Sequence, residues 1–270
     1  MFAIGADDGR IHKIRIFSEQ TCLQCGSEVP STRPIAGMVR PCEDRPGLAA
    51  GYFADFGVCV VIQDPLAAHL ANNKYGRFTL TEAIRPALEV PIRPRQGYRV
   101  DVFRDRTNAF RLPMLSASIS SELLFDTFLS LVDILGEEVN VVLESSHRHE
   151  DEKHQDLRRN HIDRPVLMSH LCEFEDLLLN CGCTGVAVMS TRRPIEVQLD
   201  EHKLIYVYAP NLKPFQRVLR ELGIKRKKNF ALIAEAEHLH HSTDDYADQF
   251  EQLCLRVGVG DSHHVFSDEV

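Results

Sequence analysis

The chain has 270 residues, of which 44% are hydrophobic and 26% are charged, values ordinary for a soluble globular protein. The formal net charge of −8 comes from residues 101–270, where 19 Lys and Arg stand against 29 Asp and Glu. An acidic domain repels phosphate backbones, so we expect no nucleic-acid partner.

Two further classes of protein are disfavoured by the sequence. No stretch reaches the roughly 18 uninterrupted apolar residues of a membrane helix, and no basic start followed by an apolar run opens the chain. We therefore expect no membrane partner and a cytoplasmic location. The 8 cysteines are too sparse and scattered for a disulfide scaffold, so most of them should be thiols.

The chain divides by pattern into three parts. Residues 1–97 form a weakly patterned N-terminal region, with a short strand at 58–62, a helix opening at Asp64-Pro65 and another turn or two of helix over 80–88. Proline and glycine over 90–98 predict a linker. Residues 98–260 form the main α/β domain, and 261–270 form a polar tail.

Within the main domain, apolar alternation predicts strands and apolar stripes at helical spacing predict helices. A serine, a proline or a glycine marks most helix ends, and residues 146–164 are expected to be a polar insertion. The predicted strands are 98–104, 112–119, 139–143, 185–189, 204–208 and 230–239, and the predicted helices are 121–135, 165–178, 214–222 and 246–257.

Two topologies fit this order, and the short segment 195–199 decides between them. If it belongs to a long hairpin connection, residues 139–239 form a ferredoxin-like βαββαβ unit, an α+β two-layer sandwich with an added N-terminal strand-helix unit and a C-terminal helix. If it is a full strand, the strands at 139, 185, 203 and 230 point the same way in a mostly parallel, doubly wound sheet. We favour the ferredoxin-like fold, because the segment is short and contains Glu196 and Gln198.

Imidazole and carboxylate side chains gather after two predicted strands. Metal-ligand candidates His147, His149 and His154 follow the strand at 139. His238 and His240, with Glu235 and Glu237 as candidates for acid-base catalysis, belong to the strand at 230. These are side chains that zinc or another divalent metal accepts, although their spacing matches no known signature. In a ferredoxin-like sheet the two clusters lie at opposite edges, so a joint site would require the parallel alternative.

A third candidate is Cys22 and Cys25 near the N-terminus, spaced as in a zinc knuckle. A structural zinc site needs four ligands, and the sequence has no second pair with this spacing. Cys181 and Cys183 follow a predicted helix C-terminus, where the partial negative charge disfavours a thiolate, so we interpret them as structural thiols.

The motifs of nucleophilic catalysis and nucleotide binding are absent from the sequence: no glycine-flanked serine elbow and no glycine-rich phosphate loop occur. The favoured function is therefore a non-enzymatic binding or regulatory module that associates with a protein or a small ligand, and a homodimer fits such association. The alternative is a metal-dependent hydrolase that uses the His and Glu clusters after the strands at 139 and 230.

Overall fold

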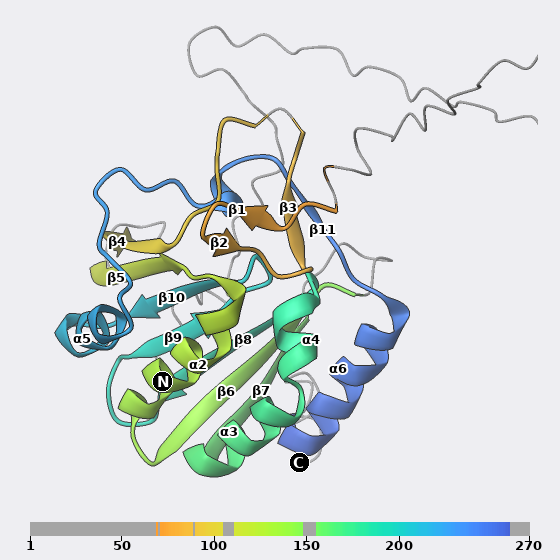
Figure 1. Cartoon of the computed structure of the whole chain (residues 1–270). Helices are drawn as coiled ribbons and strands as arrows, with labels where there is room; N and C mark the ends of the chain where they lie inside the picture. The colour runs from red at the N-terminus through yellow and green to blue at the C-terminus, as the bar shows by residue number, and fades with distance from the viewer. Residues whose placement is uncertain (1–68, 70, 89, 105–110, 148–154, 260–270) are drawn as a thin grey trace, which may run out of the picture.

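The structure, a computed structural model, describes residue 69 and residues 71–88, 90–104, 111–147 and 155–259 (Figure 1). The predicted strand at 58–62, the helix opening at Asp64-Pro65 and the polar tail lie outside these residues, as do Cys22, Cys25, His149 and His154. None of the helices in the described part of the chain is long and apolar enough to cross a membrane.

A seven-stranded sheet forms the centre of the molecule, and all of its neighbouring strands are antiparallel. The predicted α+β class is confirmed, and the mostly parallel alternative is wrong. In spatial order the strands are β4 (Gly97–Arg104), β5 (Arg111–Ser118), β10 (Leu204–Tyr208), β9 (Glu196–Leu199), β8 (Thr184–Ser190), β6 (Glu138–Ser145) and β7 (Gln155–Asp163).

Strand β7 is the reason that β6 and β8 are antiparallel. Residues 155–163 lie in the segment predicted as a polar insertion, but they pair with β6 and reverse the chain before the next helix. The register shifts between Val139 and Val141, where β7 has one residue more than β6, so both Leu157 and Ile162 are buried despite their odd spacing. The bulge and the polar residues of an edge strand hide the alternation in the sequence.

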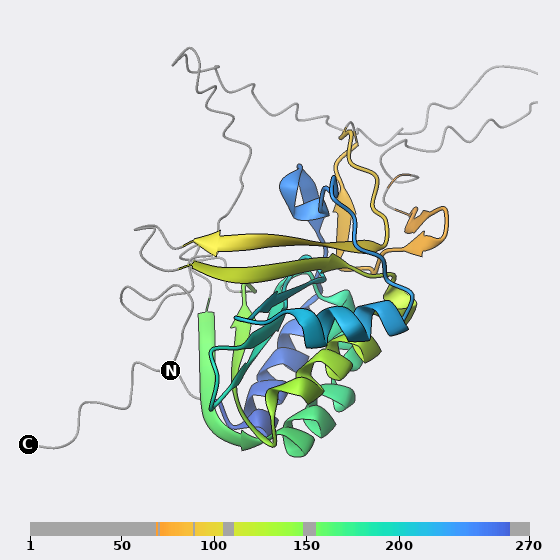
Figure 2. The same cartoon turned by 90° about the vertical axis from the view of Figure 1, so that its left-hand side faces the viewer.

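The helices lie together on one side of the sheet (Figure 2). Their apolar stripes pack against alternate sheet residues such as Val141, Val186 and Val197 in one continuous core. The four helices predicted in the main domain are confirmed, although the one predicted over 165–178 is divided into two helices at Phe174. The helices are α2 (Ser121–Val132), α3 (Arg164–Glu173), α4 (Glu175–Asn180), α5 (Lys213–Glu221) and α6 (Asp244–Val257), with a short 3-10 turn, η1 (Asp133–Leu135), after α2.

Two small sheets adjoin the large one (Figure 1). Strands β1 (Lys74–Tyr75) and β2 (Phe78–Thr79) form a hairpin, and β3 (Ile84–Pro86) pairs with β11 (His238–His240). The helix expected over 80–88 is therefore wrong, because this segment contains the strand β3 with Ile84 fully buried.

The last predicted strand, 230–239, is also wrong over most of its length. Only β11 is extended, and it lies outside the seven-stranded sheet. Before it, Ile233–Glu235 form a 3-10 turn, η2, in which the Glu235 carboxylate accepts a hydrogen bond from the Leu232 backbone N–H at 3.0 Å and forms an ion pair with Arg99. Without this strand in the sheet, and with 196–199 a full strand, the ferredoxin-like order is not confirmed.

Candidate metal centre

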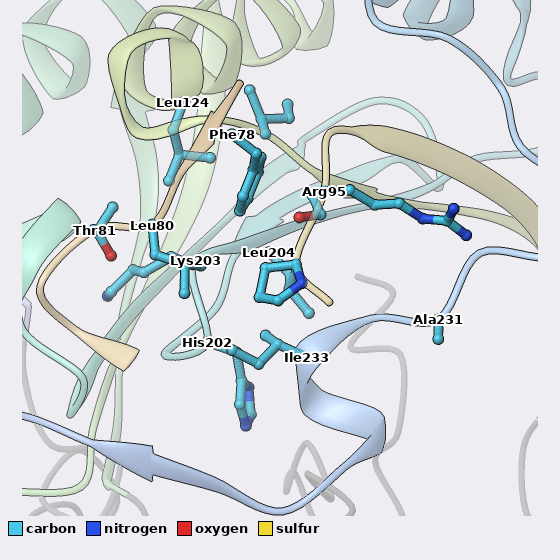
Figure 3. Close-up of a pocket in the computed structure, with 13 residues that line it drawn as sticks. Phe78, Leu80, Thr81, Arg95, Leu124, His202, Lys203, Leu204, Ala231 and Ile233 are labelled. Carbon is cyan, nitrogen blue, oxygen red and sulfur yellow. The ribbon is translucent and has the colours of Figure 1, made fainter. Parts of the chain in front are cut away.

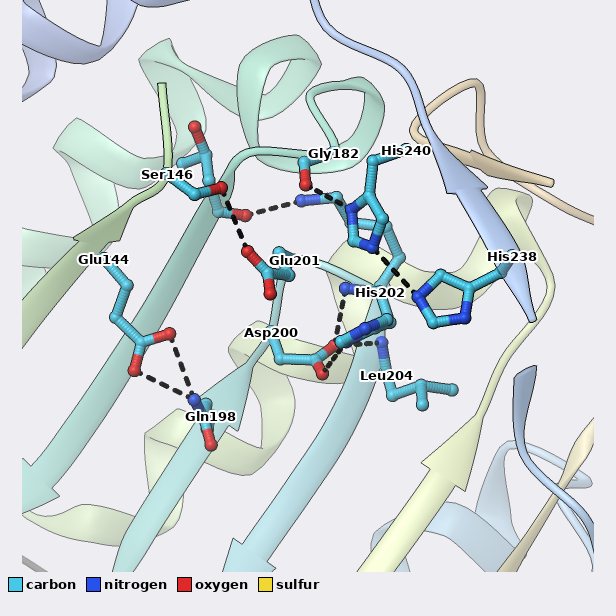
Figure 4. Close-up of polar contacts among 12 residues, drawn as sticks. Glu144, Ser146, Gly182, Gln198, Asp200, Glu201, His202, Leu204, His238 and His240 are labelled. Carbon is cyan, nitrogen blue, oxygen red and sulfur yellow. Dashed lines mark hydrogen bonds and ion pairs between the residues drawn. The ribbon is translucent and has the colours of Figure 1, made fainter. Parts of the chain in front are cut away.

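His202 lies in the tight turn between β9 and β10, and Asp200 fixes its position (Figure 4). One oxygen of the Asp200 carboxylate accepts the backbone N–H of His202 at 3.0 Å and that of Leu204 at 2.9 Å. The other accepts Nδ1–H of the His202 ring at 2.7 Å. Asp200 is itself buried, so this carboxylate fixes both the turn and the orientation of the imidazole.

His238 and His240 reach the same place from β11. Residues two apart on a strand point to the same side, so both rings leave β11 in one direction. Nδ1 of His238 donates to the carbonyl oxygen of Ala236 at 2.6 Å, and Nδ1 of His240 donates to that of Gly182 at 2.6 Å. Each ring therefore has its Nδ1 hydrogen-bonded to an oxygen, as the ring of His202 has.

The three imidazoles converge on one point. One ring nitrogen from each of His202, His238 and His240 lies within 4.8 Å of the other two, and Nε2 of His238 is 3.0 Å from Nε2 of His240. The ring centroids are 4.8 to 5.0 Å apart. This is the one group of three or more His, Cys, Asp or Glu side chains in the described residues that is close enough to hold a metal ion.

The surroundings of the rings favour neutral imidazole. Burial lowers the pKa of His238 and of His240, and the nearby His202 lowers both further. The carboxylates of Asp200 and Glu201 act on His238 in the opposite direction, but burial is the largest cause. A neutral imidazole is the form that binds a metal ion.

Gly182 brings β11 and β8 together behind His240. Its N–H donates to the carbonyl oxygen of His241 at 2.7 Å, while its own carbonyl receives His240 Nδ1–H. A Cβ atom at this position would lie 2.4 Å from the Ala83 carbonyl oxygen and 2.9 Å from that of His241. The crossing of these three backbone segments therefore requires glycine.

Of the residues predicted for a metal site, the structure brings His238 and His240 together and places His147 elsewhere. Nε2 of His147 is 3.1 Å from the Cys181 sulfur, and its Nδ1 is 2.8 Å from the Ser145 hydroxyl. The ring also packs against Phe250, with centroids 5.8 Å apart. His149, His154, Cys22 and Cys25 lie outside the described residues.

Cys181 is buried, and polar groups surround its sulfur. Its sulfur is 3.1 Å from the Ser242 hydroxyl, 3.3 Å from that of Thr184 and 3.4 Å from the Cys183 backbone nitrogen, besides the contact with His147. Hydrogen bonds lower the pKa of Cys181 to about 3, with that from the Cys183 side chain as the largest cause, and the same side-chain pairing raises the pKa of Cys183. These donors outweigh the helix C-terminus that we expected to disfavour a thiolate.

The two glutamates predicted as acid-base catalysts are positioned differently from the histidines. Glu235 is held by Arg99 and by the turn η2, and Glu237 is exposed beside β11. Glu201 is the carboxylate that accompanies the metal centre instead. It is buried next to His202, and its Oε2 accepts a hydrogen bond from the Ser146 hydroxyl at 3.2 Å (Figure 4).

Sequence reasoning missed His202, because this residue lies between the segment 195–199 and the predicted strand 204–208, outside both clusters of metal-ligand candidates. The available signal was a histidine in a short strand connection with an aspartate two residues before it. An aspartate at that offset can bond both the backbone and the imidazole, as Asp200 does here.

A small cavity borders the backbone side of His202, between the β1–β2 hairpin, the β9–β10 turn and η2 (Figure 3). Its lining includes Phe78, Leu80, Leu124 and Ile233, and its volume is about 10 Å³. That is room for one water molecule at most, so this cavity is no substrate site.

Comparison with protein-family models, with curated proteins and with solved structures finds no match to the chain.

Proposed function

We propose that the protein is a metal-dependent hydrolase that holds a zinc ion with His202, His238 and His240. The observation that supports the proposal is the convergence of three imidazoles, each with its Nδ1 already bonded to an oxygen. In metal sites the second ring nitrogen of a histidine ligand is almost always bonded in this way, to a carboxylate, a carbonyl or water.

The distances between the rings suit a tetrahedral ion. Two nitrogens at the zinc–nitrogen distance of about 2.0 to 2.1 Å are roughly 3.3 Å apart around one ion. Nε2 of His238 and Nε2 of His240 are 3.0 Å apart, and the third nitrogen lies within 4.8 Å of both. Binding of the ion would draw the third nitrogen closer to the other two.

A site with three imidazoles suits chemistry rather than a purely structural role. Structural zinc sites have four protein ligands, whereas catalytic sites have three and keep one position for water, whose pKa zinc lowers to about 7. Asp200 would orient His202, and the Ala236 and Gly182 carbonyls would orient His238 and His240.

Glu201 is the residue we assign as general base. It adjoins His202 in the sequence, its charge acts on both His238 and His240, and Ser146 holds one of its oxygens. A buried carboxylate beside the open position would accept the proton of the attacking water. Glu235, the base expected from the sequence, is occupied by Arg99.

Metal content tests the first half of the proposal. Protein purified without a histidine tag is measured by elemental mass spectrometry, as wild type, His202→Ala and His147→Ala. We expect about one zinc per chain in the wild type and in His147→Ala, and a loss in His202→Ala, because of these two residues only His202 is a proposed zinc ligand. Equal metal content in both variants, or none in the wild type, would refute the site.

Hydrolysis of chromogenic substrates tests the second half. We expect turnover of p-nitrophenyl acetate, p-nitrophenyl phosphate or bis(p-nitrophenyl) phosphate, and a chelator should abolish it. The Glu201→Gln variant should retain its zinc but hydrolyse the substrate about 100-fold or more slowly. Bound zinc with no turnover of any of the three would reject the hydrolase. The non-enzymatic binding or regulatory module would then be the better proposal.

A further inference from the structure

A larger cavity, of about 290 Å³, lies at the other end of β8, beside the turn that leads to β9. The histidine cluster adjoins the start of β8 through Gly182, and the cavity adjoins its end at Ser190. Seven residues of β8 at about 3.3 Å each separate the two places by roughly 20 Å. The cavity is therefore independent of the metal centre.

Glu196 lines this cavity from the sheet face that points away from the helices. The register places it beside Met189, and Met189 beside Asn140. Its side chain is almost fully buried, at 3% exposed, and its Oε2 has no hydrogen-bond partner in the part of the chain that the structure describes. Buried polar atoms nearly always have a partner, so this oxygen points to a group that the described part of the chain does not supply.

The electrostatics of Glu196 agree with this. The pKa of Glu196 is raised to about 8, first by burial and then by the neighbouring Glu144 carboxylate, while Arg158 acts in the opposite direction. A carboxyl group kept mostly protonated at neutral pH is costly to ionise, and a cationic or hydrogen-bonding ligand group would offset that cost.

Positively charged guanidinium groups line other sides of the cavity, opposite in charge to a carboxylate. Arg158 belongs to β7, and Arg192 and Arg193 belong to the β8–β9 turn. One nitrogen of Arg193 donates to the carbonyl oxygen of Ile134 at 2.9 Å, which connects the turn to η1. Guanidinium is the side chain best suited to bind a carboxylate or a phosphate through paired hydrogen bonds.

We infer that the cavity binds a small two-ended molecule, with a carboxylate or phosphate group bound by Arg158, Arg192 and Arg193 and an amino or hydroxyl group bound by Glu196. The volume is at the lower end of the range for small-molecule sites, which limits the ligand to a compact metabolite-sized molecule. Asn140 and Asn160, also in the lining, offer further hydrogen bonds to its middle.

Calorimetric titration of the full chain with four probes tests this inference. Phosphoethanolamine and β-alanine have both ends, whereas inorganic phosphate and ethanolamine have one each. We expect a two-ended probe to bind at least about tenfold more tightly than either single-ended one, since the second end adds a charge-assisted hydrogen bond. Comparison of phosphoethanolamine with β-alanine shows whether the anionic group is a phosphate or a carboxylate.

Variants connect the binding to the cavity. The double variant Arg192→Gln/Arg193→Gln should lose binding of the anionic end, and Glu196→Gln should reduce the two-ended probe to the affinity of the single-ended anion. Arg217→Gln on α5, where the guanidinium pairs with Glu221, and His202→Ala at the metal centre should both bind as the wild type does. No binding by any probe, or equal binding in the cavity variants, would overturn the inference.

Discussion

The two ends of strand β9 each have a buried carboxyl group, and the two groups have opposite surroundings. Asp200, just past the C-terminal end, is 5% exposed and accepts hydrogen bonds from two backbone N–H groups and one imidazole. Glu196, at the N-terminal end, is 3% exposed, and within the described residues its Oε2 has no partner.

The difference indicates that the Asp200 carboxylate stabilises its own turn, whereas the Glu196 carboxyl group can bind a ligand. The donors around Asp200 come from its own turn, so its burial is compensated locally and the carboxylate can orient His202. Glu196 has no such compensation from its turn, and the cost of its burial appears as a raised pKa. Sequence pattern alone cannot tell these two acidic residues apart.

The largest effect should come from removing the charge at Glu196. Its pKa of about 8 in the fold, against about 4.3 in the unfolded chain, means that stability falls as pH rises from about 4 to 8 and stays low above that. The full loss is up to about 5 kcal/mol, at about 1.4 kcal/mol per pKa unit. Glu196→Gln should therefore be more stable than the wild type above pH 8, with little difference near pH 4.

Urea unfolding at several pH values measures this difference. Glu221→Gln is the matched control, because Glu221 lies on the surface of α5 with its side chain 61% exposed, and it should unfold as the wild type does. If Glu196→Gln and the wild type showed the same pH dependence, Glu196 would be compensated as fully as Asp200 is, and the contrast between the two ends of β9 would disappear.

The next largest effect should follow from Gly182→Ala, at the Asp200 end of β9. The new Cβ would lie 2.4 Å from the Ala83 carbonyl oxygen, so the segments that cross there must separate. We expect a loss of about 2 to 3 kcal/mol in the free energy of unfolding, together with weaker zinc binding, because the Gly182 carbonyl orients His240.

Gly76→Ala is the control for the glycine prediction. Gly76 has a positive φ, of 71°, but a Cβ atom at this position would have no other atom within 4 Å, so only the backbone cost of about 1 kcal/mol applies. Zinc binding in Gly76→Ala should equal that of the wild type. A stable Gly182→Ala variant with unchanged zinc affinity would show that the crossing does not position His240.

The fold was predictable from the sequence where periodicity is regular. The stripe of Leu124, Phe128 and Leu131 predicts α2, and the apolar run around Val186 predicts β8, because each element buries one repeating set of side chains. Strand β7 was not predicted, because a bulge breaks its alternation. The prediction for 230–239 was wrong because Glu235 closes a turn by accepting the Leu232 backbone N–H, while its other oxygen pairs with Arg99, a partner far away in the sequence.

The candidate site was predictable only where its residues are close together in the sequence. His238 and His240 lie two apart on one strand, so local spacing places them together. His202 joins them through long-range contacts, because β11 pairs with β3 and the Gly182 backbone bonds to His240 and His241. Conversely, His147 was grouped with the metal candidates by sequence proximity, although its ring bonds to Cys181 and Ser145.

The smallest and most selective effect should come from Asp200→Asn. The amide oxygen can still accept the backbone N–H groups of His202 and Leu204, so the turn and the stability of the fold should change little. The amide nitrogen, however, cannot accept Nδ1–H of His202, and the negative charge beside the ring is lost. We expect zinc affinity to fall by about 10- to 100-fold, measured by competition with a chromogenic chelator.

Asp101→Asn provides the comparison for a carboxylate outside the site, because Asp101 pairs with Arg99 on the surface of β4. Its zinc affinity should remain that of the wild type. If Asp200→Asn kept the wild-type affinity as well, Asp200 would serve the turn alone and His202 would be oriented by its ring contacts with His238 and His240. A loss of affinity without a loss of stability would instead assign Asp200 to the metal centre, since the backbone bonds that the amide oxygen retains account for the turn.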